Sequence, residues 1–151
     1  MLRITPEQME AFGAAAFRRF VDRLVEHVRL VFMAHCDALG REGLRPFVEQ
    51  QVERARDCGV VGERSVCRYV DLTFAFGSGF RDDPEMTWSK DEGPGVDEMR
   101  SAAMDYLEEL TAGDEDEVPD VVGAGEAAVP ADRLRDLLEA AFANADLTFS
   151  E

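Results

Sequence analysis

The chain has 151 residues, of which 46% are hydrophobic and 32% charged, and its formal net charge is −16. A length of this order is typical of a single domain, and so acidic a chain repels nucleic acid and anionic lipid. The excess charge lies in one half: residues 1–81 contain 12 arginines against 11 acids, whereas residues 82–151 contain 4 basic residues against 21 acids, a net of −17. We therefore expect no nucleic-acid partner and no membrane partner.

The sequence also bears on the cellular compartment. No apolar run reaches the roughly 20 residues that span a bilayer, and the opening MLRITPEQME lacks the basic and then apolar pattern of a secretory signal. The cysteines, Cys36, Cys58 and Cys67, are odd in number and form no CxxC pair, which favours free thiols in a reducing compartment. These features predict a cytoplasmic protein.

The two histidines do not indicate a metal site. His27 and His35 are eight residues apart on one expected helix, which separates them by about 12 Å along its axis, too far to share one ion. We therefore expect neither a metal nor another cofactor.

The first predicted helix is unusually long. It begins at Pro6, which suits a first turn, and an apolar stripe continues to about Leu39, where Gly40 suits a helix end. Its length of about 51 Å exceeds the roughly 38 Å width of a compact domain of this size. We expect this helix to project, or to bend or break near Gly13 or within 30–34.

Two further helices are predicted before the middle of the chain. The first covers residues 43–58, and the second covers residues 63–76, with Glu63 favourable at its start and Gly77 at its end. Apolar alternation over 70–76 also fits a strand, but no partner strand is evident elsewhere.

The second half predicts two more helices and a linker. A helix from Val96 to Leu110 completes a helical domain over residues 1–112. Residues 113–129 are acidic and rich in glycine and proline, which is typical of a flexible linker. Pro130 then opens a helix over 130–144, within a C-terminal segment of 130–151. The sequence thus predicts an all-α, single-domain bundle of about five helices.

An aromatic cluster around residue 77 is the candidate for partner binding. Its members are Tyr69, Phe74, Phe76, Phe80 and Trp88. Aromatic side chains beside a loop make good anchors for a protein partner, but the same residues could close the core. The sequence leaves both possibilities open.

The motifs of common enzymes are missing from the sequence. The GSG at 77–79 follows the predicted helix instead of opening one, and acids surround its nearby cation, Arg81, which disfavours phosphate binding. No EF-hand spacing and no nucleophile motif is present. We therefore expect a protein that is not an enzyme and has no catalytic residue.

The segment ERSVCRYVDLTFAFGSGFRDDPEMTW (63–88) resembles a motif of small helical accessory proteins encoded in bacterial type VI secretion gene clusters, beside spike, PAAR-like or effector genes. The similarity covers about residues 4–88, although Thr87 stands where that motif has a proline. The matching positions are Glu63, Val66, Cys67, Arg68, Tyr69, Asp71, Leu72, Phe74, Phe76, Gly77, Phe80, Asp83, Pro84 and Trp88.

This resemblance implies an adaptor or co-chaperone that holds a secreted effector or spike protein. The acidic second half suggests an alternative, an immunity or inhibitor protein that neutralises a basic toxin. The last helix could also pair with a second copy and form a homodimer.

Overall fold

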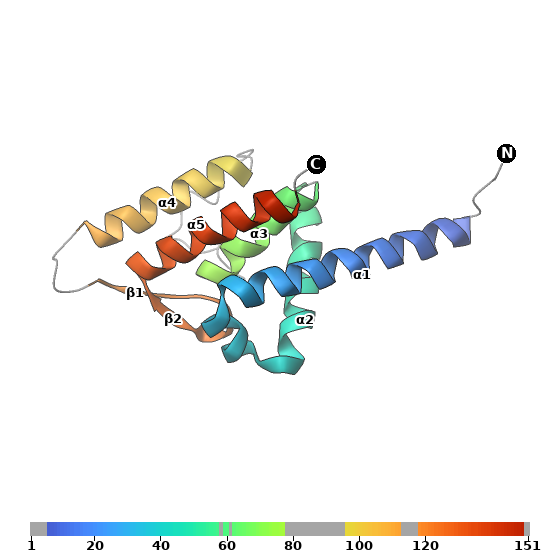
Figure 1. Cartoon of the computed structure of the whole chain (residues 1–151). Coiled ribbons are helices and arrows are strands. Elements are labelled where there is room, and N and C mark those ends of the chain that lie inside the picture. The colour runs from blue at the N-terminus through green and yellow to red at the C-terminus, as the bar shows by residue number, and fades with distance from the viewer. Residues whose placement is uncertain (1–5, 58, 61, 78–95, 113–117, 150–151) are drawn as a thin grey trace.

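The computed structural model describes residues 6–57, 59–60, 62–77, 96–112 and 118–149. Within them the chain forms α1 (Pro6–Val31), α2 (Met33–Asp57), α3 (Glu63–Phe76), α4 (Val96–Thr111) and α5 (Ala131–Thr148), with a small hairpin of β1 (Asp120–Val122) and β2 (Ala128–Pro130). The predicted all-α helical bundle is confirmed. Figure 1 shows α3, α4 and α5 side by side, with the first turns of α1 projecting beyond the other helices.

Helix α3 is the centre of the fold. Eleven consecutive residues, Val66–Phe76, are buried, so this helix is covered on every side, as expected for a helix that is apolar around most of its circumference. Gly77 ends it with a φ of 92°, and the Gly77 N–H donates to the Thr73 carbonyl at 2.7 Å. The predicted helix over 63–76 is confirmed, and the strand alternative is wrong.

The long first helix breaks and folds back on itself. Helix α1 ends at Val31, and the buried Phe32 separates it from α2, so the predicted break within 30–34 is confirmed, whereas Gly13 lies inside α1. Helix α2 then changes direction at Gly40, whose φ of 79° lies in the region that favours glycine. The predicted helix over 43–58 corresponds to the part of α2 after this kink, which ends at Asp57, while residue 58 lies outside the described residues.

The predicted flexible linker needs correction. Of residues 113–129, those from 118 onward form the hairpin, in which Asp120 pairs with Pro130 and Val121 with Val129, while 113–117 lie outside the described residues. The turn between the strands packs against α2 and α3. The sequence did not indicate this structure because strands of three residues are too short for their alternation to stand out.

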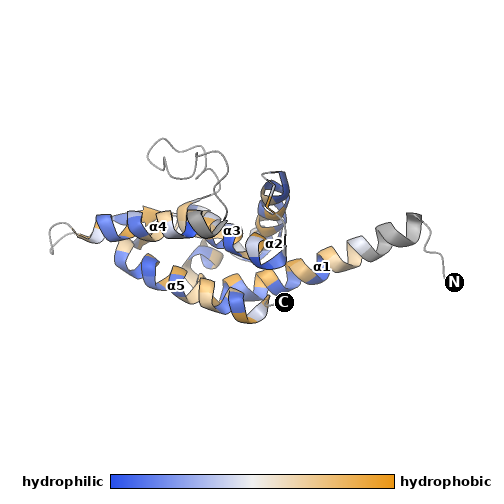
Figure 2. Ribbon diagram, turned by 90° about the horizontal axis from the view of Figure 1, so that it is seen from above, coloured by the Kyte–Doolittle hydropathy of each residue, from blue (hydrophilic) through white to orange (hydrophobic). Residues whose placement is uncertain are grey.

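Helix α5 belongs to the same core as the preceding helices. It contacts α1, α3 and α4, and its buried face includes Leu134, Leu138 and Phe142. The helix therefore packs within its own chain instead of forming a separate C-terminal segment. Figure 2 shows the amphipathic character of the helices, with hydrophilic residues along their outer sides. None of the described helices combines the length and apolar character needed to cross a bilayer.

Candidate functional site

The predicted aromatic anchors do not form an exposed patch. Tyr69, Phe74 and Phe76 are buried on α3, where they pack in the core. Phe80 and Trp88 lie outside the described residues. Three of the five residues therefore cannot contact a partner in this conformation, because their side chains already serve the fold.

A second group, which the sequence did not indicate, is a buried polar network between α1, α3 and α5. His27 Nε2 lies 2.7 Å from Asp71 Oδ1, and the other ring nitrogen of His27 lies 2.7 Å from Asn144 Nδ2. Arg68, one turn before Asp71 on α3, forms an ion pair with Asp146 on α5. These contacts fix the mutual positions of three helices that are distant in sequence.

Burial dominates the electrostatics of this network. It raises the pKa of Asp71, while the hydrogen bond from His27 and the charges of His27 and Arg68 act in the opposite direction. Burial also raises the pKa of the Cys67 thiol well above its ordinary value. Because Cys67 is enclosed and remains protonated, the free thiol is a poor nucleophile, and the network does not resemble a catalytic Cys–His pair.

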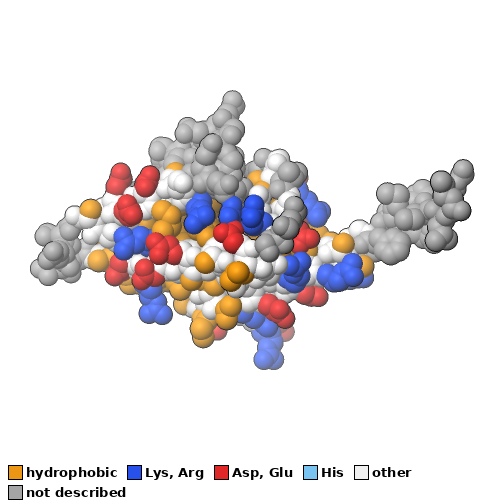
Figure 3. Space-filling view, turned by 45° about the horizontal axis from the view of Figure 1, so that its top comes forward, with side chains coloured by type: hydrophobic (Ala, Val, Ile, Leu, Met, Phe, Trp, Pro, Cys, Tyr) orange, Lys and Arg blue, Asp and Glu red, His pale blue; other side chains and the backbone are white. Residues whose placement is uncertain are grey.

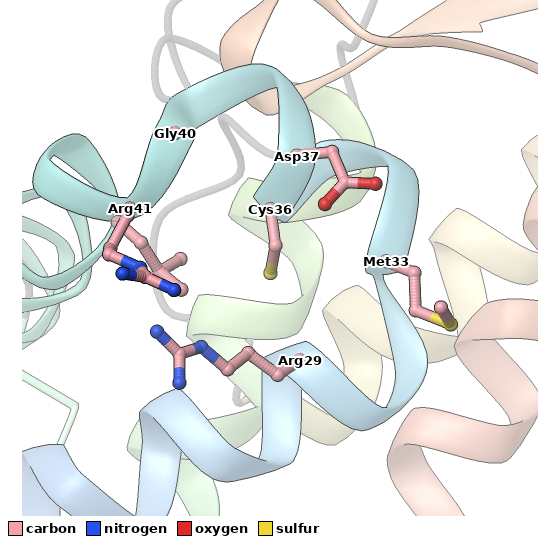
Figure 4. A pocket seen from close by; sticks show the side chains of 7 residues that line it. Arg29, Met33, Cys36, Asp37, Gly40 and Arg41 are labelled. Atoms are coloured by element: carbon pink, nitrogen blue, oxygen red, sulfur yellow. The ribbon is translucent and has the colours of Figure 1, made fainter.

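A surface site lies where α1 ends and α2 kinks. Arg29 of α1 and Arg41 of α2 line a pocket of about 320 Å³, together with Cys36 and Leu44. Figure 4 shows the two guanidinium groups pointing toward one another and the Cys36 sulfur directed into the same space, whereas the carboxylate of Asp37, which also lines the pocket, is directed away from the guanidinium groups. Neither arginine forms an ion pair with another described residue.

An exposed apolar side chain adjoins this pocket. Met33, which lines the pocket, is 66% exposed, whereas Leu30, which is 70% exposed, lines a different hollow together with His27 and Asn144. Two cations that form no ion pair with the described residues, and an exposed apolar side chain on the same pocket, form a surface that could hold a carboxylate and an apolar group at once. We call Arg29, Met33 and Arg41 the junction surface.

Comparisons with known proteins give no relative. No family model matches the chain, and no curated protein or solved structure matches it significantly.

His35 shows how tightly the hairpin covers the core. It is fully buried, its ring meets that of Phe32 edge-on at 5.4 Å, and neither ring nitrogen has a hydrogen-bond partner among the described residues. This burial lowers the pKa of His35 to about 4 from its ordinary 6.5. The folded chain therefore holds this imidazole neutral at pH values where the unfolded chain protonates it.

This difference predicts a loss of stability in mild acid. Above pH 6.5 the contribution of His35 to the free energy of unfolding is fully present. Between pH 6.5 and about 4, the unfolded state binds a proton that the folded state does not bind. The free energy of unfolding therefore falls as the pH falls. Through His35 alone, the free energy of unfolding should be about 2–3 kcal/mol lower at pH 4.5 than at pH 7. Urea unfolding at pH 7 and pH 4.5 measures it.

The variant His35→Leu separates this effect from the other titrating groups. It should lose less stability than the wild type over the same pH interval, by the amount attributed to His35. Equal pH dependence in the two proteins would show that the folded chain protonates His35 as readily as the unfolded one.

Proposed function

We propose that this chain is a protein-interaction module without enzymatic activity, an adaptor or co-chaperone that holds a secreted effector or spike protein. The observation that carries the proposal is the junction surface, where Arg29 and Arg41 face one another with no ion-pair partner among the described residues and the exposed Met33 lines the same pocket. Arginine and methionine are enriched at the centres of protein interfaces.

The chemistry of the junction surface defines its partner. Two guanidinium groups directed into one pocket repel each other, and a carboxylate between them would relieve this repulsion while accepting hydrogen bonds from both forks. Met33, on the wall of the same pocket, would contact an apolar side chain beside that carboxylate. We therefore propose that the partner presents an acidic residue next to an apolar one.

The strong negative charge of the chain does not preclude an acidic partner segment. The excess acids lie in residues 82–151, whereas residues 1–81 are nearly neutral. On the face that Figure 3 shows, several acidic side chains lie at the end of the molecule formed by α4 and α5, and others lie among basic side chains nearer α1. At physiological ionic strength the Debye length is about 8 Å, so exposed charges farther away are largely screened.

The test co-expresses this chain with the proteins whose genes adjoin its own gene and measures binding by co-purification and calorimetry. The double variant Arg29→Glu/Arg41→Glu should bind the partner at least about 30-fold more weakly, since each reversal leaves a carboxylate facing another. The matched control is Arg133→Glu, an exposed charge reversal on α5, which should bind normally. Unchanged affinity in a folded double variant, or no binding by the wild type, would contradict the proposal.

A second candidate, an immunity or inhibitor protein for a basic toxin, rests on a different surface. Asp105 and Glu108 of α4 and Glu139 of α5 line a hollow of about 440 Å³. In the same binding experiment, this function predicts that Asp105→Lys/Glu139→Lys abolishes binding while the Arg29→Glu/Arg41→Glu variant binds normally. Its association rate should also fall steeply with added salt.

A further inference from the structure

Three side chains that can ligate a metal meet in the core where α1 contacts α3. His27 comes from α1, and Cys67 and Asp71 are four residues apart on α3, which places them on one face of that helix. Their potential ligand atoms all lie within 4.8 Å of one another, and all three residues are buried. Neither spacing along the chain nor the pair of histidines indicated this convergence.

We propose that this cluster is a zinc site formed by His27 Nε2, Cys67 Sγ and a carboxylate oxygen of Asp71. Thiolate sulfur, imidazole nitrogen and carboxylate oxygen are the donors that tetrahedral Zn²⁺ takes in proteins. A thiolate and a carboxylate together neutralise the charge of the ion, which suits a buried position. Three protein ligands leave the fourth position for water or a small ligand.

Two features of the surroundings favour a bound cation beside Asp71. Asp71 Oδ2 is buried and accepts no hydrogen bond from the described residues, which is costly for a carboxylate unless a cation satisfies it. Asn144 lies against His27 Nδ1 at 2.7 Å and so holds the ring with Nε2 directed at Asp71. A metal-binding histidine donates a hydrogen bond from its second nitrogen, and Asn144 can accept it through its carbonyl oxygen after the amide turns over.

Binding requires only a small rearrangement. His27 Nε2 and Asp71 Oδ1 are 2.7 Å apart, a hydrogen-bond distance, whereas two ligands of a tetrahedral zinc with bonds of about 2.0–2.1 Å lie about 3.3 Å apart. The ion takes the place of the proton on His27 Nε2, and the imidazole carries its proton on Nδ1 instead. The Asn144 amide turns over, so that its carbonyl oxygen accepts the hydrogen bond from Nδ1. The Cys67 thiol proton leaves to solvent, so one proton is released per ion bound.

A surface hollow adjoins the proposed site. It has a volume of about 280 Å³ and is lined by Arg23, Glu26, His27, Leu30, Asn144 and Thr148. Because His27 and Asn144 form part of its wall and Cys67 and Asp71 do not, an ion that enters from this hollow has to pass the His27–Asn144 contact to reach the ligand atoms.

The experiment is a titration of the whole chain with Co²⁺ after removal of metal with a chelator. We expect one Co²⁺ per chain, with the intense near-ultraviolet absorption of a cobalt–thiolate bond and the visible bands of tetrahedral coordination, and we expect Zn²⁺ to displace it. Zinc should also raise the unfolding temperature, because it binds the folded state. Absence of the thiolate absorption, or no zinc retained at one per chain, would overturn the proposal.

Variants assign the ligands without a large change in shape. Cys67→Ser removes the sulfur and should abolish the cobalt–thiolate absorption. The control is Cys36→Ser, which replaces another buried cysteine, at the α1–α2 junction, and should retain the absorption. Asn144→Ala should weaken zinc binding by about 10–100-fold while the absorption keeps its form. An unchanged absorption in Cys67→Ser would assign the metal to other thiols and overturn the site.

Discussion

Replacing Phe74 with alanine should lower the free energy of unfolding by about 3–5 kcal/mol. Phe74 is fully buried on α3, stacked on Phe32 with ring centroids 5.6 Å apart and edge-on to Phe47 at 5.2 Å. The alanine variant leaves a cavity between these rings, and a loss of this size is a third or more of the stability of many domains. Urea denaturation followed by circular dichroism measures it.

The same substitution distinguishes the two roles that the sequence left open for the aromatic cluster. If Phe74 were a partner anchor, its truncation would weaken binding and leave the isolated chain stable. The matched control is Leu147→Ala on α5, whose side chain is 81% exposed and whose loss should change the stability by no more than about 0.5 kcal/mol. A Phe74→Ala chain as stable as the Leu147→Ala chain would contradict the core assignment.

The helices were predictable where local signals agreed. The segment 63–76 combined an acidic start, a continuous apolar run and a glycine at its end, and the observed α3 has these bounds. Length indicated that a straight helix from Pro6 to Leu39 would exceed the width of the domain, but it left projection, a break near Gly13 and a break within 30–34 open, of which the structure has the last at Phe32. Both predictions depended on residues close together in the sequence.

The candidate sites were not predictable in this way. His27 and Asp71 are separated by 44 positions, and only the packing of α1 against α3 determines that they meet. Cys67 and Asp71 are four residues apart on α3, but this spacing alone does not indicate a site, because the third member, His27, comes from another helix. Arg29 and Arg41 likewise point toward one another only because α2 changes direction at Gly40.

The hairpin was not predicted from the sequence, because the glycines in this segment indicated a flexible linker. Gly123 has φ of −113° and ψ of −152°, an extended conformation open to any residue, so its importance is not conformational. It allows a close approach of two backbones instead. A Cβ at this position would lie 2.2 Å from the Phe74 carbonyl oxygen, 2.7 Å from that of Ala75 and 2.9 Å from His35 Cδ2.

Gly123→Ala should therefore destabilise the chain by about 3 kcal/mol or more. The added methyl group meets backbone atoms at the end of α3, which cannot turn aside as a side chain can, so the hairpin must lift from the core. For a chain of this length, such a loss lowers the unfolding temperature by about 6–12 °C. A thermal unfolding scan checks the prediction.

Gly13→Ala is the matched control for this substitution. It adds the same methyl group inside α1, where no atom of the described residues outside the helix's own backbone lies within 4 Å of the new Cβ, so it should stabilise the chain by up to about 1 kcal/mol through helix propensity. The opposite signs separate a close contact from a general effect of replacing glycine. If both variants unfolded at or above the wild-type temperature, the hairpin would not be seated on α3, and the burial of His35 beneath it would lose its explanation.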